Sequence, residues 1–292
     1  MSEGLRESMI VHHGIENAKL DLSTVIARHS ADRAVSYKEV DGQSLFLALF
    51  LPQGHPPGEC RGTIFMIHGG GWSARKVFDD QTGWQGDYLG FLARYYADRG
   101  FVCIGIDYRL IQDDGQKPGY GLPDLCKDCC DAICYAVDHG RMYGIDPERL
   151  YLLGESAGGY LAAMLPTLPE LHTIRFQKLL LVNPITDLEM EHWGKFVPPR
   201  YDRMALSPVN RISEEMPAAV LLHGTADAVV SPHHSELFER RMHEKNRSCE
   251  LHLLDGARHA FLLAEYYSDG TDFYKTAIGI LNQALHPDNE RK

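Results

Sequence analysis

Short apolar runs that alternate with helical segments are the feature that most constrains the fold of this 292-residue chain. Each run has the length of a buried strand, and the segments between them have room for helices. The runs are Thr63–Ile67, Phe101–Ile106, Leu150–Leu153, Leu179–Val182, Ala218–Leu222 and Leu251–Leu254. Strands that alternate with helices form βαβ crossovers, which cover a parallel sheet with helices on both faces. The sequence therefore predicts an α/β fold.

Two other regions have clear local signatures. Val35–Val40 and Leu45–Leu51 flank Asp41-Gly42, a dipeptide that supplies positive φ in a tight hairpin turn, which predicts an antiparallel pair. The segment from Tyr120 to Tyr143 predicts one amphipathic helix, because at 100° per residue its apolar side chains fall in one stripe. The stripe consists of Leu122, Leu125, Cys126, Cys129, Ile133, Ala136 and Val137, and the opposite face carries Asp124, Lys127, Asp128, Asp131 and Asp138.

The remaining segments set the expected domain organisation. Residues 1–33 show weak periodicity and mixed charge, so we expect an N-terminal arm that packs on a single domain formed by residues 34–292. Pro184–Pro217 interrupts the alternation, lacks a clear period and is rich in aromatic residues and proline. Its length suits a small lid over a binding site, and no internal repeat points to a second domain.

Composition excludes several classes of protein. Hydrophobic residues make up 44% and charged residues 24% of the chain, which is typical of a globular protein and not of a disordered one. The formal charge of -11 argues against a nucleic-acid partner. The first ten residues contain no apolar core of a secretory signal, and nowhere do eighteen uncharged apolar residues follow one another. Seven cysteines, an odd number, favour free thiols, so we expect a cytoplasmic protein without a membrane span.

A serine motif carries the first indication of chemistry. The segment Gly154–Gly159 reads Gly-Glu-Ser-Ala-Gly-Gly, follows the run Leu150–Leu153 and precedes the helix-like run Tyr160–Leu165. Strand, sharp turn and helix are the context of a nucleophile elbow, in which small neighbours let the turn expose Ser156 at the end of the sheet. The motif alone arises by chance in roughly one chain in ten of this length. The plainer interpretation makes Ser156 a helix N-cap.

A glycine run strengthens the case for a serine nucleophile. His68-Gly69-Gly70-Gly71-Trp72 directly follows the run Thr63–Ile67. Glycines let a backbone approach a substrate closely, so amides of this loop and of Ala157 would converge on the oxyanion of a tetrahedral intermediate. The alternative is a flexible turn after a strand.

A serine nucleophile needs a base and an orienting carboxylate, and two later loops supply candidates. Asp227 lies just past the run Ala218–Leu222, and His259 lies in the loop after Leu251–Leu254. The order Ser, Asp, His is the one that accompanies this elbow motif. The rival acids, each of which also follows a strand, are Asp187 and Asp255. The other histidines weighed as the base are His68, which would brace its own loop, and His223, His233, His234, His243 and His252, which fall in or beside strands and helices.

The cysteines of the amphipathic helix do not have the spacing of a metal site. Cys126 and Cys134 are roughly 12 Å apart along a helix axis, too far for the four sulfurs of Cys126, Cys129, Cys130 and Cys134 to meet around one zinc ion. We therefore expect no metal and no other cofactor.

Together these residues resemble the α/β-hydrolase fold, and within it the carboxylesterases that are hormone-sensitive-lipase-like or feruloyl and acetyl-xylan-esterase-like. The resemblance covers about residues 34–285 and includes Asp107-Tyr108-Arg109-Leu110 at the end of a strand. It implies a mostly parallel eight-stranded sheet whose second strand is antiparallel. It also implies a triad of Ser156, Asp227 and His259 and an oxyanion hole formed by Gly70, Gly71 and Ala157.

The chain departs from the hormone-sensitive-lipase-like pattern in two ways. Residues 1–33 are short for the large N-terminal cap of that group, and the position of Glu155 more often holds Asp. The lack of a large cap predicts a shallow acyl pocket. We therefore expect a serine carboxylesterase for short acyl groups, acetyl above all, with an acetylated carbohydrate as the favoured ester.

The side chains that could offer flat surfaces to a sugar ring are Trp72, Trp84, Trp193 and Tyr201, although core packing is the favoured role for any one of them. Two other functions stay open. The same residues suit an arylformamidase-like amide hydrolase, and a catalytically inactive hydrolase fold would serve as a small-molecule receptor. The sequence predicts no oligomeric state.

Overall fold

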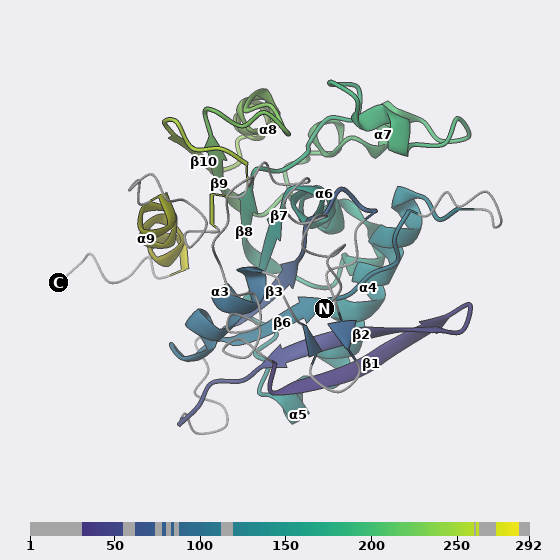
Figure 1. Cartoon of the computed structure of the whole chain (residues 1–292), viewed down its shortest axis with the longest axis vertical. Coiled ribbons are helices and arrows are strands. Elements are labelled where there is room, and N and C mark those ends of the chain that lie inside the picture. The colour runs from purple at the N-terminus through teal and green to yellow at the C-terminus, as the bar shows by residue number, and fades with distance from the viewer. Residues whose placement is uncertain are drawn as a thin grey trace, which may run out of the picture.

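The computed structural model describes residues 31–54, 62–73, 78–79, 83–84, 88–111, 119–259, 261–262 and 273–285. An eight-stranded sheet runs through its centre in the order β1-β2-β6-β3-β7-β8-β9-β10 (Figure 1). The strands are β1 (Arg33–Val40), β2 (Gln43–Phe50), β3 (Thr63–Ile67), β6 (Val102–Ile106), β7 (Leu150–Glu155), β8 (Phe176–Val182), β9 (Ala218–Gly224) and β10 (Cys249–Leu254). A separate antiparallel pair consists of β4 (Phe78–Asp79) and β5 (Gly83–Trp84). The sequence prediction of a mostly parallel eight-stranded sheet is confirmed.

The hairpin at the edge of the sheet also forms where the sequence predicts it. Strands β1 and β2 pair antiparallel around Asp41 and Gly42, whose φ angles are 52° and 78°. Two consecutive positive φ angles define the hairpin turn that matches the twist of the flanking strands. Strand β2 is antiparallel to β6 as well, and every later neighbour in the sheet pairs in parallel.

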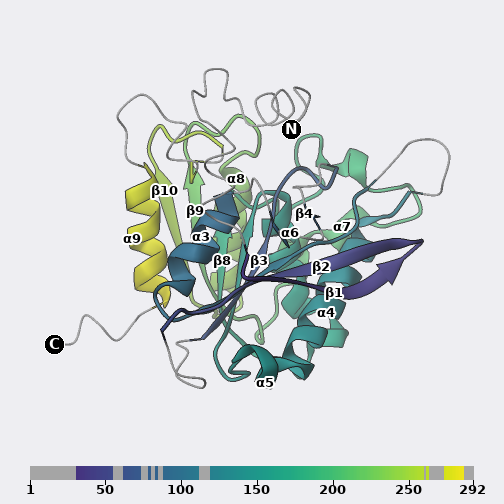
Figure 2. The ribbon, with the colours of Figure 1, turned by 60° about the horizontal axis from the view of Figure 1, so that its bottom comes forward.

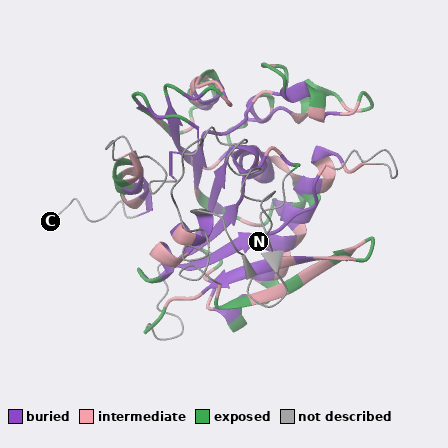
Figure 3. Ribbon diagram, viewed as in Figure 1, coloured by how far each residue is buried: buried purple, intermediate pink, exposed green. Residues whose placement is uncertain are grey.

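Helices cover both faces of the sheet (Figures 1 and 2). They are α3 (Tyr88–Ala97), α4 (Leu122–Asp138), α5 (Gly140–Tyr143), α6 (Ala157–Met164), α7 (Arg203–Leu206), α8 (His233–Glu244) and α9 (Phe273–Leu285), with short 3₁₀ turns η1 (Leu165–Thr167), η2 (Pro169–Leu171), η3 (Trp193–Phe196) and η4 (Pro208–Asn210). Because side chains alternate along a strand, Phe65 and Ile67 of β3 join a core with α4, α6 and α8. Ile64 and Met66 join a second core with α3 and α9. The buried residues accordingly concentrate along the strands (Figure 3).

The amphipathic helix differs from its prediction in two respects. It ends at Asp138, and α5 follows as a separate turn that ends at Gly144 with a positive φ of 73°. Asp128, predicted on the solvent face, is fully buried. The reason is tertiary, because α4 packs against β1 of the edge hairpin, and Asp128 contacts Lys38 of that strand and Arg109.

The segment 184–217 has little regular structure but is well packed. It contains η3, α7 and η4, and its buried apolar side chains join the core on the α6 side. They are Ile185, Leu188, Trp193, Val197, Val209, Ile212 and Met216. Almost all of the expected N-terminal arm lies outside the described residues. Among the helices that the structure describes, none has both the length and the apolar character to cross a membrane.

Candidate active site

The turn between β7 and α6 places Ser156 in a strained conformation. Its φ and ψ are 53° and -118°, a region that residues other than glycine rarely adopt. Glycines make the turn possible, because a Cβ on Gly154 would lie 2.3 Å from the carbonyl oxygen of Gly158. A Cβ on Gly158 would lie 2.0 Å from the carbonyl oxygen of Ile67. The elbow is therefore pressed directly against the end of β3.

Three strand ends bring the predicted nucleophile, base and acid together. His259 follows β10 and Asp227 follows β9, while Ser156 follows β7. The Nε2 atom of His259 lies 3.1 Å from Oγ of Ser156, and its Nδ1 atom lies 2.7 Å from Oδ2 of Asp227. All three side chains are buried. The arrangement lets the imidazole take a proton from the hydroxyl while the carboxylate stabilises the cation that forms.

Hydrogen bonds keep the acid charged. Oδ1 of Asp227 accepts the amides of Val229 and Val230 at 2.8 and 2.9 Å. Burial raises the pKa of Asp227, but hydrogen bonds from His223 and His259 lower it by more than burial raises it. The pKa of Asp227 therefore lies well below the usual range of a carboxyl. Asp227 is therefore a carboxylate at neutral pH. Sequence reasoning missed the contact with His223, whose Nε2 lies 3.4 Å from Oδ2 of Asp227.

The rival acids lie elsewhere. Oδ1 of Asp255 accepts the hydroxyl of Thr225 at 3.1 Å and is exposed. Oδ1 of Asp187 accepts the backbone amide of Glu189 at 2.8 Å and the hydroxyl of Ser207 at 3.3 Å. Both carboxylates are thus engaged away from the imidazole of His259.

Two of the other histidines have structural roles. His68 stacks on Tyr108 with ring centroids 4.3 Å apart, and its Nδ1 lies 2.7 Å from the carbonyl oxygen of Gly69, so it braces its own loop. His234 in α8 is buried, and its Nδ1 accepts the backbone amides of Thr186 and Asp187, each at 3.2 Å. Burial lowers the pKa of His234 to about 3.

The glycine loop after β3 lies beside the elbow. Gly70, Gly71 and Trp72 all have positive φ angles, of 108°, 61° and 58°. The indole Nε1 of Trp72 donates to the carbonyl oxygen of Ala157 at 3.0 Å, which ties the loop to the first turn of α6. Backbone amides of Gly70, Gly71 and Ala157 form no hydrogen bond with any other residue that the structure describes. Amide groups in this state are suited to receive an oxyanion.

Glu155 is a site residue to which the sequence analysis gave no role. Its side chain is buried, and its Oε1 lies 3.6 Å from Nε2 of His259. A Cβ on Gly69 would lie 2.1 Å from its Oε2, so the carboxylate also contacts the glycine loop. The only signal in the sequence was its place directly before the predicted nucleophile.

The aromatic side chains near the site pack on one another and not on a ligand surface. Trp72 is fully buried, with its ring centroid 5.9 Å from that of Trp193 and 5.4 Å from that of Phe196. Core packing, the role that the sequence analysis favours, is therefore the role of Trp72 and Trp193, and neither of the two offers an exposed surface to a sugar ring. Tyr201 is half-buried, and the side chain of Trp84 lies outside the described residues.

The cysteines of α4 are also core residues. Cys126 and Cys129 are buried, and burial raises the pKa of both thiols. Burial likewise raises the pKa of Cys130 to about 12. Within the described ranges, no three His, Cys, Asp or Glu side chains are grouped in a way that could hold a metal ion.

Comparisons with known proteins point to esterases. The BD-FAE family model matches residues 47–189. Arylacetamide deacetylase from Bos taurus is 31% identical over 46% of this chain, and ethyl acetate hydrolase from Pseudomonas putida is 28% identical over 50% of it. The chain spans only 31% and 42% of the lengths of these two relatives.

Solved structures agree over a greater length. Thermogutta terrifontis esterase 2, phosphoramylated by tabun, is 26% identical with a TM-score of 0.72, over 89% of this chain and 95% of that one. Its propionate-bound form is also 26% identical, with a TM-score of 0.72 over 88% and 94% of the two chains.

Proposed function

From its membership of the α/β-hydrolase superfamily, in the branch of the hormone-sensitive-lipase-like carboxylesterases, we propose that the chain is a serine ester hydrolase for short acyl groups. One observation carries the proposal. The hydrogen-bonded series from Asp227 to His259 to Ser156, at 2.7 and 3.1 Å, meets the geometric requirement for an activated serine.

The proposed reaction has two halves. Nε2 of His259 takes the proton of Ser156 as Oγ forms a bond with the ester carbonyl carbon, and amides of Gly70, Gly71 and Ala157 hold the oxyanion. The intermediate collapses, the alcohol leaves with the proton from His259, and the acyl group stays on Ser156. Water then attacks the acyl-enzyme with the same base, and the carboxylic acid leaves.

We propose acetyl to butyryl as the preferred acyl groups. Propionate-bound and butyrate-bound forms of Thermogutta terrifontis esterase 2 support this size. In our proposal the segment 184–217 acts as a small lid, since Trp193 and Phe196 of η3 pack against Trp72 beside the glycine loop. Of the aromatic side chains that the acetylated-carbohydrate hypothesis uses, Tyr201 is the one in the described residues that is not buried.

Amide hydrolysis is the second candidate function. One relative is named an arylacetamide deacetylase, and the same serine, histidine and carboxylate can attack an amide carbonyl. An N-aryl acetamide and N-formylkynurenine are the discriminating substrates. Faster turnover of either one than of any ester would assign the protein to amide hydrolysis.

The test uses the purified full chain with 4-nitrophenyl esters from acetate to palmitate. We expect kcat/KM to peak between acetate and butyrate, because a shallow pocket stops gaining the ~0.8 kcal/mol that each further buried CH₂ contributes. Ser156→Ala should lower kcat by a factor of about 10³ or more. Paraoxon should add one diethylphosphoryl group to the wild-type chain and none to Ser156→Ala, as measured by mass spectrometry. A variant with more than a tenth of wild-type activity would contradict the acyl-enzyme, and a peak at octanoate or longer would contradict the short acyl group.

A further inference from the structure

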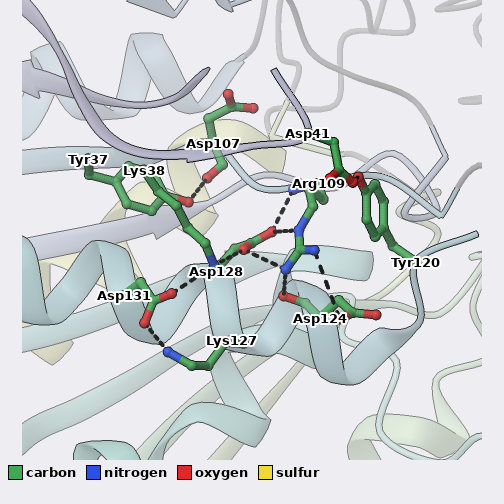
Figure 4. Close-up of polar contacts among 10 residues, drawn as sticks. All are labelled: Tyr37, Lys38, Asp41, Asp107, Arg109, Tyr120, Asp124, Lys127, Asp128 and Asp131. Carbon is green, nitrogen blue, oxygen red and sulfur yellow. Dashed lines mark hydrogen bonds and ion pairs between the residues drawn. The ribbon is translucent and has the colours of Figure 1, made fainter. Parts of the chain in front are cut away.

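A charged cluster with a buried centre lies between α4 and strand β1 of the edge hairpin (Figure 4). Its centre is the carboxylate of Asp128, which has no exposed surface. Asp128 accepts Nε and Nη2 of Arg109 at 2.7 and 2.9 Å, and Nζ of Lys38 at 2.6 Å. It also accepts the backbone amide of Arg109 at 3.1 Å. One carboxylate therefore fixes both the side chain and the main chain of Arg109.

The cluster determines the path of the segment 107–111, which follows β6. The carbonyl oxygen of Asp107 accepts the hydroxyl of Tyr37 at 2.7 Å, two residues before the amide that Asp128 holds. Nη2 of Arg109 in turn donates to the carbonyl oxygen of Asp124 at 3.2 Å. Side chains from β1 and α4 thus hold this piece of backbone from two sides.

The segment 107–111 contacts both ends of the glycine loop. At the first end, the hydroxyl of Tyr108 donates to the carbonyl oxygen of His68 at 2.7 Å, and the two rings stack with an interplanar angle of 13°. At the last end, the amide of Ile111 donates to the carbonyl oxygen of Trp72 at 2.8 Å. Gly70 and Gly71 lie between these two anchors. Their amides are the proposed oxyanion donors, so their position depends on where the segment 107–111 lies.

We propose that Asp128 and Arg109 are positioning residues of the oxyanion hole, which act through the segment 107–111 on the glycine loop. The inference rests on the proposed esterase function. Removing the charge of Asp128 leaves the largely buried guanidinium of Arg109 with Asp124, at 3.9 Å, as its remaining carboxylate neighbour, a state that favours movement of the side chain toward water. An asparagine can keep its carbonyl oxygen in the place of Oδ2, which accepts the amide and Nε of Arg109, but its NH₂ group then faces Nη2 of Arg109 and Nζ of Lys38. Donors face a donor there, so the side chain of Arg109 moves and shifts the backbone of the segment 107–111.

A small shift suffices for a large kinetic effect. Oxyanion donors act on the transition state more than on the bound substrate, so their displacement lowers kcat more than it changes KM. A displacement of about 1 Å can cost on the order of 10²-fold in rate. A cluster that only stabilised the fold would change the fraction of active enzyme and leave the kcat of each active molecule unchanged.

The experiment compares Asp128→Asn with Asp131→Asn in the full chain. Asp131 lies one turn further along α4 and contacts Lys38 at 2.7 Å, but its other partner is the exposed Lys127. Each substitution removes one negative charge beside Lys38, and only the first reaches the segment 107–111. Active sites are counted by the burst of 4-nitrophenol that forms when paraoxon phosphorylates the serine. The measurements are kcat per titrated serine, KM for 4-nitrophenyl butyrate, and Kd for phenylboronic acid, which forms a tetrahedral adduct on a serine.

For Asp128→Asn we expect kcat per active site to fall about tenfold or more, KM to change less than about twofold, and the boronate Kd to rise by a factor similar to the loss in kcat. Asp131→Asn should match the wild type in all three. An unchanged kcat and boronate Kd in Asp128→Asn would overturn the inference, as would equal losses in both variants.

A second variant decides the question if Asp128→Asn does not fold. Tyr108→Phe removes the hydrogen bond to His68 without burying a charge, and it should show the same loss of kcat and boronate affinity, whereas unchanged values would overturn the inference. A different result would refute the proposed function itself. If the wild type hydrolyses no ester, or if Ser156→Ala is as active as the wild type, the esterase assignment is wrong irrespective of these variants.

Discussion

Replacing Asp227 with Asn tests the proposal that Asp227 sets the tautomer of His259, the proposed general base. The amides of Val229 and Val230 both point at Oδ1, so the carbonyl oxygen of an asparagine must occupy that place. Its NH₂ group then takes the position of Oδ2, 2.7 Å from Nδ1 of His259. A donor at that point requires Nδ1 to accept, which moves the ring proton to Nε2, the atom that faces Ser156. In this tautomer the imidazole cannot take the serine proton.

The expected loss is about 10⁴-fold in kcat, the magnitude that a wrong tautomer causes in serine hydrolases. At 1.36 kcal/mol per tenfold, this corresponds to about 5 kcal/mol of activation free energy. The assay is the steady-state hydrolysis of 4-nitrophenyl butyrate at pH 7.5 after circular dichroism has verified the fold.

Asp255→Asn and Asp187→Asn are matched controls, because each removes one carboxylate from a neighbouring loop that does not hold His259. We expect both controls to keep most of the wild-type activity. A loss of less than tenfold in Asp227→Asn would refute the tautomer argument, and a larger loss in either control would move the acid to that position.

Two other predictions concern packing and pH. Gly158→Ala places a Cβ 2.0 Å from the carbonyl oxygen of Ile67, so we expect at least about 3 kcal/mol of destabilisation in urea unfolding together with loss of activity. The control Gly279→Ala, in open space on α9, should be neutral or slightly stabilising, and a stable, active Gly158→Ala would contradict the elbow packing. His234 has a pKa of about 3 in the folded chain and of about 6.5 in the unfolded chain. Below pH 6.5 the unfolded chain therefore binds a proton that the folded chain does not. The folded state loses stability as the pH falls from about 6.5 toward 3. Between pH 7 and 4.5 the free energy of unfolding of the wild type should therefore fall by about 2–3 kcal/mol more than that of His234→Gln. The amide oxygen of the glutamine can still accept the backbone amide of Thr186. Equal losses in both proteins would show that His234 is not held neutral.

The parts of the fold that the sequence predicted are those that local rules determine. A buried parallel strand must be a short apolar run, and β3 (Thr63–Ile67) forms with the predicted bounds. The turn at Asp41 and Gly42 requires positive φ angles that few other dipeptides supply. Candidates for the site could be located for the same reason. The carboxyl ends of parallel strands lie at one edge of a sheet, so Ser156, Asp227 and His259 had to lie at that edge once their strands were recognised.

The misses share one physical cause, which is that a helical or strand period does not reveal what packs on the far side of an element. At 100° per residue Asp128 falls on the polar face of α4, but β1, a distant part of the chain, packs over that face and buries Asp128 with Arg109. Trp72 lies in a loop, where no period applies, so the sequence favoured core packing for it but could not identify its partner Trp193, which lies 121 positions later in the chain. A buried carboxylate on the polar face of a helix needs a cation from another element, because an unpaired charge there would be too costly. In this chain that cation is Arg109, which belongs to the motif Asp107-Tyr108-Arg109-Leu110 that the sequence analysis had already identified. In this chain the pair of Arg109 and Asp128 holds the segment 107–111, whose hydrogen bonds to His68 and Trp72 support the glycine loop.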